Sequence, residues 1–291
     1  MNELDESKAV SELDAIIDEF IDRSKIFVQA SCYLPGLRDI RKGLKTIRHV
    51  YDHEYLAFTK SAKTLISIRN LLDLGNGEDV YVLVRSIFEN YLAARFINEN
   101  VHTISDLPLL EEYIQNRIKI SSGYYSVKHS KVLDEQGKQV AKTRSIRSQR
   151  LELDKLYYDM FYGYISRFAH LDFSNLDYYL DDDQGFTINK ESDEVLTRLF
   201  TVFVYTKLFE TIVTIENEDF YDEFEEEKCY KIVSDSLILQ RRLFHEYIQS
   251  LNFEVEDNVF DQHRLNLQFM LSNMNRSLED NIGDFNKDGL F

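Results

Sequence analysis

The sequence predicts an all-α protein, a multi-helix bundle of about eight helices, and three observations support this prediction. The 291 residues include only 10 Gly and 2 Pro, and so few turn-forming residues favour long helices joined by short connections. The hydrophobic content of 44% is sufficient for a sizeable core. Apolar residues recur at helical spacing along most of the chain. The core should be aromatic, because 18 Tyr and 20 Phe are present and Trp is absent.

The first half of the chain divides at two turn-forming sites. Residues 3–30 have the apolar spacing of an amphipathic helix that buries one face, and 34–36 (Leu-Pro-Gly) should end it. A basic stretch follows, and 55–74 is again amphipathic. The tight turn 75–77 (Gly-Asn-Gly) then predicts that the helices 55–74 and 79–98 are antiparallel neighbours.

The segment 79–98 is the most apolar long helix candidate, with Asp79 as its expected cap. Its apolar residues cover nearly the whole circumference, so the helix should be buried. Arg85 and Glu89 are four residues apart and therefore lie on one face. A charged pair on such a helix needs partners. Two interpretations remain open, a structural ion pair that fixes helix docking and a functional site.

The second half of the chain predicts further helices at 106–130, 151–171, 190–216, 229–250 and 258–278, followed by a polar tail that should fray. The acidic run 216–228 is expected to be a solvated helical face or a linker. The stretch 128–150 is polar and basic and suggests an exposed loop that enters a helix. It is either solvated surface or a phosphate-attracting, nucleic-acid-binding patch, and its cationic residues are Lys128, Lys131, Lys138, Lys142, Arg144, Arg147 and Arg150.

Composition excludes several classes of protein. The net charge of −17 disfavours general nucleic-acid binding, so any such contact needs a local basic patch. No apolar run approaches the ~20 residues of a membrane span. Cys32 and Cys229 match no metal-binding spacing and suggest reduced core thiols of a cytoplasmic protein. Glycine-rich phosphate loops and the common zinc and nucleophile motifs are absent, so no cofactor and no metal are expected.

Two groups of residues could carry chemistry. The first joins Arg85 and Glu89 with Tyr162, Ser166 and His170, which follow at steps of four and should line one helix face. In this group the carboxylate would orient the imidazole as a general acid or base, while the guanidinium stabilises an anion. A structural core histidine satisfied by Glu89 is the alternative. The second and weaker group is Arg48 with His53.

These motifs resemble a bacterial family known as domain of unknown function 5677. The resemblance covers roughly residues 55–215 and rests on the turn 75–77, the Arg85–Glu89 motif and the Tyr162, Ser166, His170 spacing. That family is all-helical and is similar to HEPN-type domains, many of which are metal-independent ribonucleases of toxin–antitoxin and anti-phage systems. The resemblance implies a HEPN-like core that often forms a homodimer.

The resulting expectation is a cytoplasmic protein of three segments: an N-terminal helical segment at 1–54, a HEPN-like core at 55–215 and a C-terminal helical extension at 216–291. It would act on RNA or nucleotides, with a metal-independent ribonuclease effector of stress response or phage defence as one such role, and with a protein partner from the same system. The alternative is a non-catalytic interaction module that binds a basic protein through its acidic surface.

Overall fold

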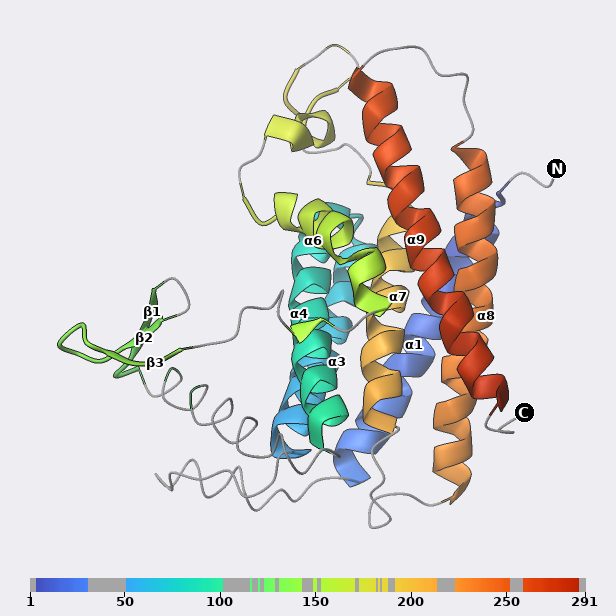
Figure 1. The fold of residues 1–291 in the computed structure, drawn as a ribbon. Helices are drawn as coiled ribbons and strands as arrows, with labels where there is room; N and C mark the ends of the chain where they lie inside the picture. Colours follow the sequence, from blue (N-terminus) through green and yellow to red (C-terminus); the bar gives the residue numbers. More distant parts are fainter. Residues whose placement is uncertain are drawn as a thin grey trace.

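Seven α-helices form a bundle in the part of the chain that the computed structural model describes (Figure 1). Apart from a few single positions, the described residues are 4–30, 51–101, 123–128, 131–142, 149–150, 153–170, 173–181, 185–187, 192–213, 223–251 and 259–287. The helices are α1 (Glu6–Ala30), α3 (Tyr51–Asp73), α4 (Gly77–Val101), α6 (Tyr158–Arg167), α7 (Glu194–Val213), α8 (Glu223–Ser250) and α9 (Val259–Lys287). The prediction of a mainly α-helical protein is therefore confirmed.

Helix α7 is the most completely buried element. Every residue of α7 except Glu194 and Glu210 is buried, because its sequence is apolar on all sides. It packs against α1, α3, α4 and α8. Helix α4 is buried along most of its length, as predicted, but its Arg85 and Glu89 reach partial exposure. The described helices share one hydrophobic core that extends from α1 to α9, whereas the proposed division into three segments stays a prediction.

The turn between α3 and α4 determines how these two helices meet. Gly75 has a φ of 74°, a left-handed conformation that glycine adopts without strain. Gly77 is the first residue of α4, and a Cβ there would come within 1.9 Å of the Ser192 Oγ. The predicted antiparallel packing of α3 and α4 is confirmed. The predicted cap is wrong, because α4 begins at Gly77 and Asp79 lies inside its first turn.

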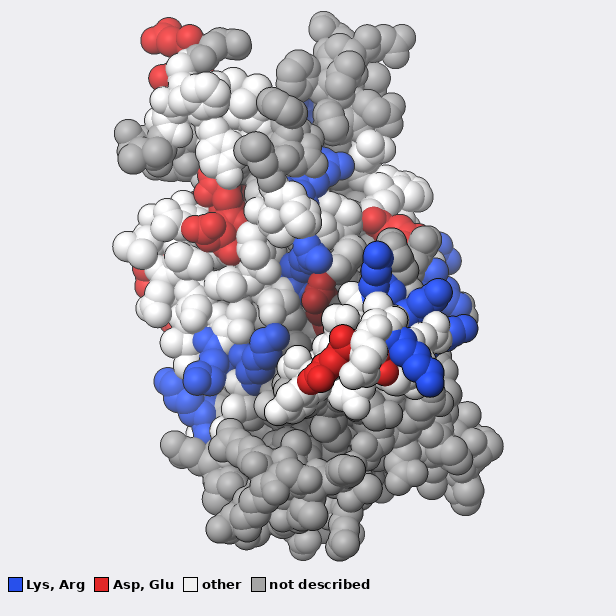
Figure 2. Space-filling view, turned by 90° about the vertical axis from the view of Figure 1, so that its left-hand side faces the viewer, with Lys and Arg blue, Asp and Glu red and all other residues white. Residues whose placement is uncertain are grey.

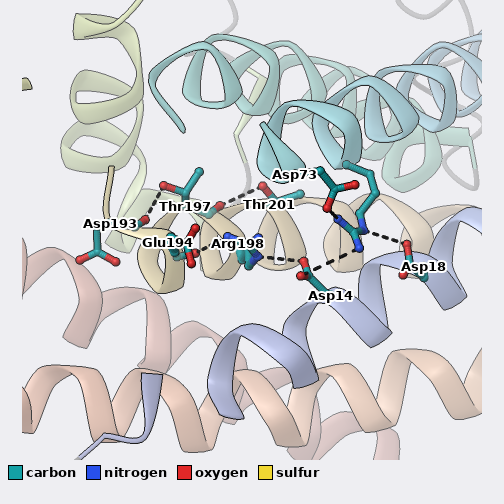
Figure 3. Close-up of polar contacts among 9 residues, drawn as sticks. Asp14, Asp18, Asp73, Asp193, Glu194, Thr197, Arg198 and Thr201 are labelled. Atoms are coloured by element: carbon teal, nitrogen blue, oxygen red, sulfur yellow. Dashed lines mark hydrogen bonds and ion pairs between the residues drawn. The ribbon is translucent and has the colours of Figure 1, made fainter. Parts of the chain in front are cut away.

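Ion pairs attach α1 to the rest of the bundle. Arg198 of α7 is only 4% exposed, and its Nε donates to the Asp14 carboxylate of α1 at 2.8 Å (Figure 3). Arg69 of α3 pairs with Asp18 of α1 and with Asp73 near its own helix end. Buried leucine, isoleucine and phenylalanine side chains cover the inward face of α1, so the predicted amphipathic helix is confirmed.

A small antiparallel sheet corrects the prediction for 128–150 and also the end of the helix predicted at 106–130, where Ser126–Lys128 form a strand. The strands β1 (Ser126–Lys128), β2 (Lys131–Leu133) and β3 (Gln139–Lys142) follow one another in a meander. The segment 128–150 was predicted to be a loop that enters a helix, and this is wrong over its first half. The strands are too short to show a clear alternation of apolar and polar residues. Figure 1 shows the sheet projecting from the side of the bundle where α3 and α4 lie.

Two predicted helix boundaries are also wrong. The segment 151–171 is divided into the 3-10 helix η3 (Leu153–Leu156) and α6, which ends at Arg167. A second 3-10 helix, η4 (Phe173–Tyr178), follows. Helix α9 continues to Lys287, well beyond the predicted 258–278. None of the helices described here combines the length and the apolar character that crossing a bilayer requires.

Candidate functional site

The strongest candidate site is a triangle of polar side chains from α4 and α6. The Arg85 guanidinium donates from Nε to Glu89 Oε1 at 3.1 Å and from Nη2 to the Tyr162 hydroxyl at 3.0 Å. The Tyr162 hydroxyl in turn donates to the same Glu89 oxygen at 2.7 Å. The predicted association of Arg85, Glu89 and Tyr162 therefore occurs, and all three groups share one hydrogen-bonded ring.

The triangle lies at the protein surface rather than in the core. The side chains of Arg85 and Glu89 are 26% and 30% exposed, so both remain accessible to a ligand. Partial burial, followed by the hydrogen bond to Glu89, raises the pKa of Tyr162 above its ordinary value. The phenol therefore stays protonated near neutral pH and acts as a hydrogen-bond donor. An exposed cation, a carboxylate acceptor and a phenol donor thus lie together.

An aromatic stack extends the site along α6. The rings of Tyr158 and Tyr162 are parallel, with centroids 5.3 Å apart. The Arg85 guanidinium lies 5.1 Å from the Tyr162 ring, and the Arg150 guanidinium lies 5.4 Å from the Tyr158 ring. Burial raises the pKa of Tyr158 to about 12. The two arginines therefore flank two stacked tyrosines, with cation–π contacts at both ends.

Tyr158 and Asp159 were missed as candidates from the sequence. Arg150 was noted only as one of several cations, although it also pairs with Asp159 at 3.4 Å. The spacing of Tyr158 and Tyr162 by four residues could have suggested that they stack. The contact with Arg150 joins α6 to a residue outside regular helix, and no periodicity indicates it.

Two of the predicted site residues are not part of the triangle. His170 was expected on one helix face with Tyr162 and Ser166, and this is wrong because α6 ends at Arg167. His170 lies in the following turn and is exposed. Glu89 bonds to Arg85 and Tyr162, and among the described side chains no hydrogen bond or ion pair joins Glu89 to His170. Ser166 does lie one turn beyond Tyr162, and its Oγ is buried without a hydrogen-bond partner.

The remaining predicted residues are only partly described. Arg48, Arg144 and Arg147 lie outside the described residues, as does the side chain of His53. Lys128, Lys131 and Lys142 are exposed on the three strands, and Lys138 follows the turn before β3. Figure 2 views the molecule from the side on which Figure 1 shows the sheet, and Lys and Arg side chains are prominent there, with a few Asp and Glu among them.

A second polar cluster lies deep between α4, α7 and η3, and the sequence analysis did not identify it. Asp154 Oδ1 accepts hydrogen bonds from Tyr91 and Tyr157, both at 2.9 Å. Arg95 donates to the Tyr91 hydroxyl at 3.2 Å. Burial lowers the pKa of Lys207, whose ammonium group lies 5.1 Å from the Phe203 ring. Except for the partly exposed Arg95, the members of this cluster are buried, so we interpret it as structural.

A cavity of about 190 Å³ between α1 and α3 contains none of the predicted site residues. Its lining is almost entirely apolar and includes Ile21, Val28, Ala62 and Ile66. Within the described part of the chain, no group of three or more His, Cys, Asp and Glu residues could hold a metal ion. The triangle on α4 and α6 therefore stays the strongest candidate site.

Comparison with known proteins gives one match. No curated protein and no solved structure matches the chain. Residues 54–187 match the model of a family of unknown function, DUF5677. This segment includes most of α3 and all of α4, the sheet, α6 and η4, and with them the Arg85, Glu89 and Tyr162 triangle. The part of the chain that holds the candidate site is thus the part that is similar to this family of unknown function.

Proposed function

We propose that this protein is a metal-independent enzyme that acts on the phosphate esters of RNA or nucleotides. The observation that carries the proposal is the partly exposed triangle of Arg85, Glu89 and Tyr162. In this triangle an anion-binding guanidinium, a carboxylate that can accept a proton and a phenol donor converge from two helices. Metal-independent cleavage of a phosphodiester needs these functions.

Each residue has a definite role in the proposal. Glu89 accepts the proton of the attacking hydroxyl group, and Arg85 binds the phosphoryl oxygens, whose charge increases in the transition state. Tyr162 orients both groups and stays protonated because its pKa is raised. His170, exposed in the turn after α6, is the candidate acid that protonates the leaving group. Ser166 lies one turn beyond Tyr162, and because its buried Oγ forms no hydrogen bond, it can support Tyr162 only by packing.

The wider proposal follows from the resemblance to HEPN-type domains. It describes a HEPN-like, homodimeric, cytoplasmic ribonuclease effector of stress response or phage defence, with a partner from the same system. The match to residues 54–187 supports only the similarity to the family of unknown function. Separate support for an activity on phosphate esters comes from the partly exposed Arg85, Glu89 and Tyr162 triangle.

The test compares two Arg–Glu pairs of the same chain. Arg242 and Glu246 on α8 have the same spacing of four and similar exposure, 39% and 27%. Glu89→Gln removes the base, and we expect the cleavage rate of total RNA or of a nucleotide panel to fall at least about 100-fold. Glu246→Gln is the matched control and should keep the wild-type rate, with similar melting curves for both variants. Absence of cleavage by the wild type, or equal loss in both variants, contradicts the proposal. His170→Ala tests the acid in the same assay.

A second candidate function is supported by a different surface. Phe186 is 83% exposed and Tyr179 is 44% exposed, on the loop that follows η4. Asp181 and Asp183 are exposed in this loop, and burial, together with the charges of Glu78 and Asp79, raises the pKa of Tyr179. An aromatic surface with acidic neighbours is suited to a basic protein segment. In this alternative the protein is a non-catalytic interaction module. The wild type then cleaves no RNA, and Phe186→Ser weakens its binding to the basic partner.

A further inference from the structure

Three lysines occupy one row across the three-stranded sheet. Lys128 of β1 lies opposite Lys131 of β2, and Lys131 lies opposite Lys142 of β3. Residues that lie directly opposite one another point to the same face of a sheet, and neighbouring strands are about 4.8 Å apart. The three ammonium groups therefore project from one face, with backbone positions within about 10 Å of one another.

This arrangement is unfavourable for the sheet by itself. Like charges directly opposite each other destabilise a pair of strands. All three lysines are exposed, and no ion pair compensates any of them within the described part of the chain. On a protein with a net charge of −17, carboxylate partners are plentiful elsewhere. The row therefore presents uncompensated positive charge.

A β-bulge creates this row. Leu133 pairs with Gln139 and Val132 pairs with Ala141, so Val140 is the extra residue. A regular register that continued from Leu133 and Gln139 would place Ala141 opposite Lys131. The bulge instead places Lys142 there, and it leaves Val140 42% exposed. Bulges of this kind redirect side chains next to functional sites. The exposed valine and the aligned like charges both reduce the stability of the sheet. This indicates that the bulge serves a function such as ligand binding rather than stability.

We propose that this face of the sheet binds the phosphodiester backbone of single-stranded RNA, an inference that rests on the proposed function and narrows its substrate to a polymer. Lysine ammonium groups bind phosphates as point charges, and the row presents three of them at regular intervals. Tyr124, which is 67% exposed and lies two residues before β1, provides an aromatic ring on which a base can stack. An acidic protein segment would match the charge but would gain nothing comparable from this ring.

The test measures binding with a probe that cannot be cleaved. A fluorescent 2′-O-methyl oligouridylate is titrated with the wild type and with the triple variant Lys128→Gln, Lys131→Gln, Lys142→Gln. Loss of three phosphate contacts should reduce the magnitude of the slope of log affinity against log salt by about 2. At about 0.1 M salt, the affinity itself should fall on the order of 100-fold. A single Lys131→Gln variant should lower the slope by about 0.7 and serves if the triple variant folds poorly.

The matched control removes the same charge elsewhere. The triple variant Lys25→Gln, Lys60→Gln, Lys63→Gln changes three exposed lysines on α1 and α3, and we expect it to bind the probe like the wild type. Equal weakening of both triple variants would mean that only net charge matters and would overturn the inference. Tighter binding of poly-glutamate than of the probe would overturn it in favour of a protein partner.

The outcomes also separate this inference from the proposed function. If the wild type cleaves no RNA but binds the probe through the three lysines, the inference about the sheet holds and the enzyme proposal is contradicted. Cleavage that depends on Glu89, together with unchanged binding by the lysine-row variant, removes the inference and leaves the enzyme proposal standing.

Discussion

Replacing the buried carboxylate of Asp154 should destabilise the fold by an amount that the structure allows us to work out. Asp154 is 1% exposed, and its Oδ1 accepts the hydroxyl protons of Tyr91 and Tyr157. Both tyrosines are fully buried, so water cannot replace a lost acceptor. Asp154→Leu keeps a side chain of similar size and removes the acceptor from both hydroxyl groups.

The expected magnitude follows from these two hydroxyl groups. A buried hydroxyl proton that loses its acceptor costs about 1–3 kcal/mol, so the two tyrosines together cost about 2–6 kcal/mol, although the Tyr91 oxygen still accepts a hydrogen bond from Arg95. The entropy of unfolding is about 2.1 cal/mol/K per residue, which gives roughly 0.6 kcal/mol/K for a chain of 291 residues. The melting temperature should therefore fall by about 3–10 °C.

Thermal and urea unfolding of Asp154 variants test this reasoning. Asp154→Asn retains an oxygen acceptor and should lose less stability than Asp154→Leu. Adding Tyr157→Phe to Asp154→Leu removes the hydroxyl whose partner was Asp154 and should recover part of the loss. Adding Tyr91→Phe as well should recover less per hydroxyl, because Arg95 then loses the Tyr91 oxygen as an acceptor. The reasoning is refuted if Asp154→Leu is as stable as Asp154→Asn, or if adding Tyr157→Phe recovers nothing.

Two further substitutions test other parts of the fold. Burial raises the pKa of Glu54 to about 8, so between about pH 4.5 and 8 the folded state holds a proton that the unfolded state releases, and stability falls as pH rises. Glu54→Gln should remove this pH-dependent change in stability, which is on the order of 4 kcal/mol between about pH 5 and 8. Urea unfolding at both pH values measures it. An unchanged pH dependence in the variant would contradict the raised pKa of Glu54. Gly77→Ala places a Cβ 1.9 Å from the Ser192 Oγ and should cost about 1–3 kcal/mol in a thermal melt. Adding Ser192→Gly should restore most of that stability, and no restoration would show that the close contact is not the cause.

Several features could be predicted from the sequence because their causes are local. Helical periodicity identified α1, α3, α4 and α7, since each must bury an apolar surface. The Gly75 and Gly77 turn identified the pairing of α3 with α4. The spacing of Arg85 and Glu89 placed them on one face, and this part of the candidate site required no tertiary information.

Other features depended on where an element ends and on the register in which strands pair. Helix α6 ends at Arg167, although the helical spacing continues in the sequence, and His170 is consequently separated from the face it was predicted to share. The strand register, and with it the row of Lys128, Lys131 and Lys142, depends on a bulge at Val140 that no periodicity reveals.

The helical character of the protein, the burial of its central helices and the shared face of Arg85 and Glu89 all follow from residue spacing within single elements. The partners that those side chains meet follow from how the elements pack against one another. Tyr162 completes the triangle from 73 residues beyond Glu89, and Asp154 lies 63 residues beyond Tyr91. Such pairs form because α4 packs against α6, and α6 in turn packs against η3, which carries Asp154. The energy of that packing is distributed over the whole core rather than encoded in any local pattern.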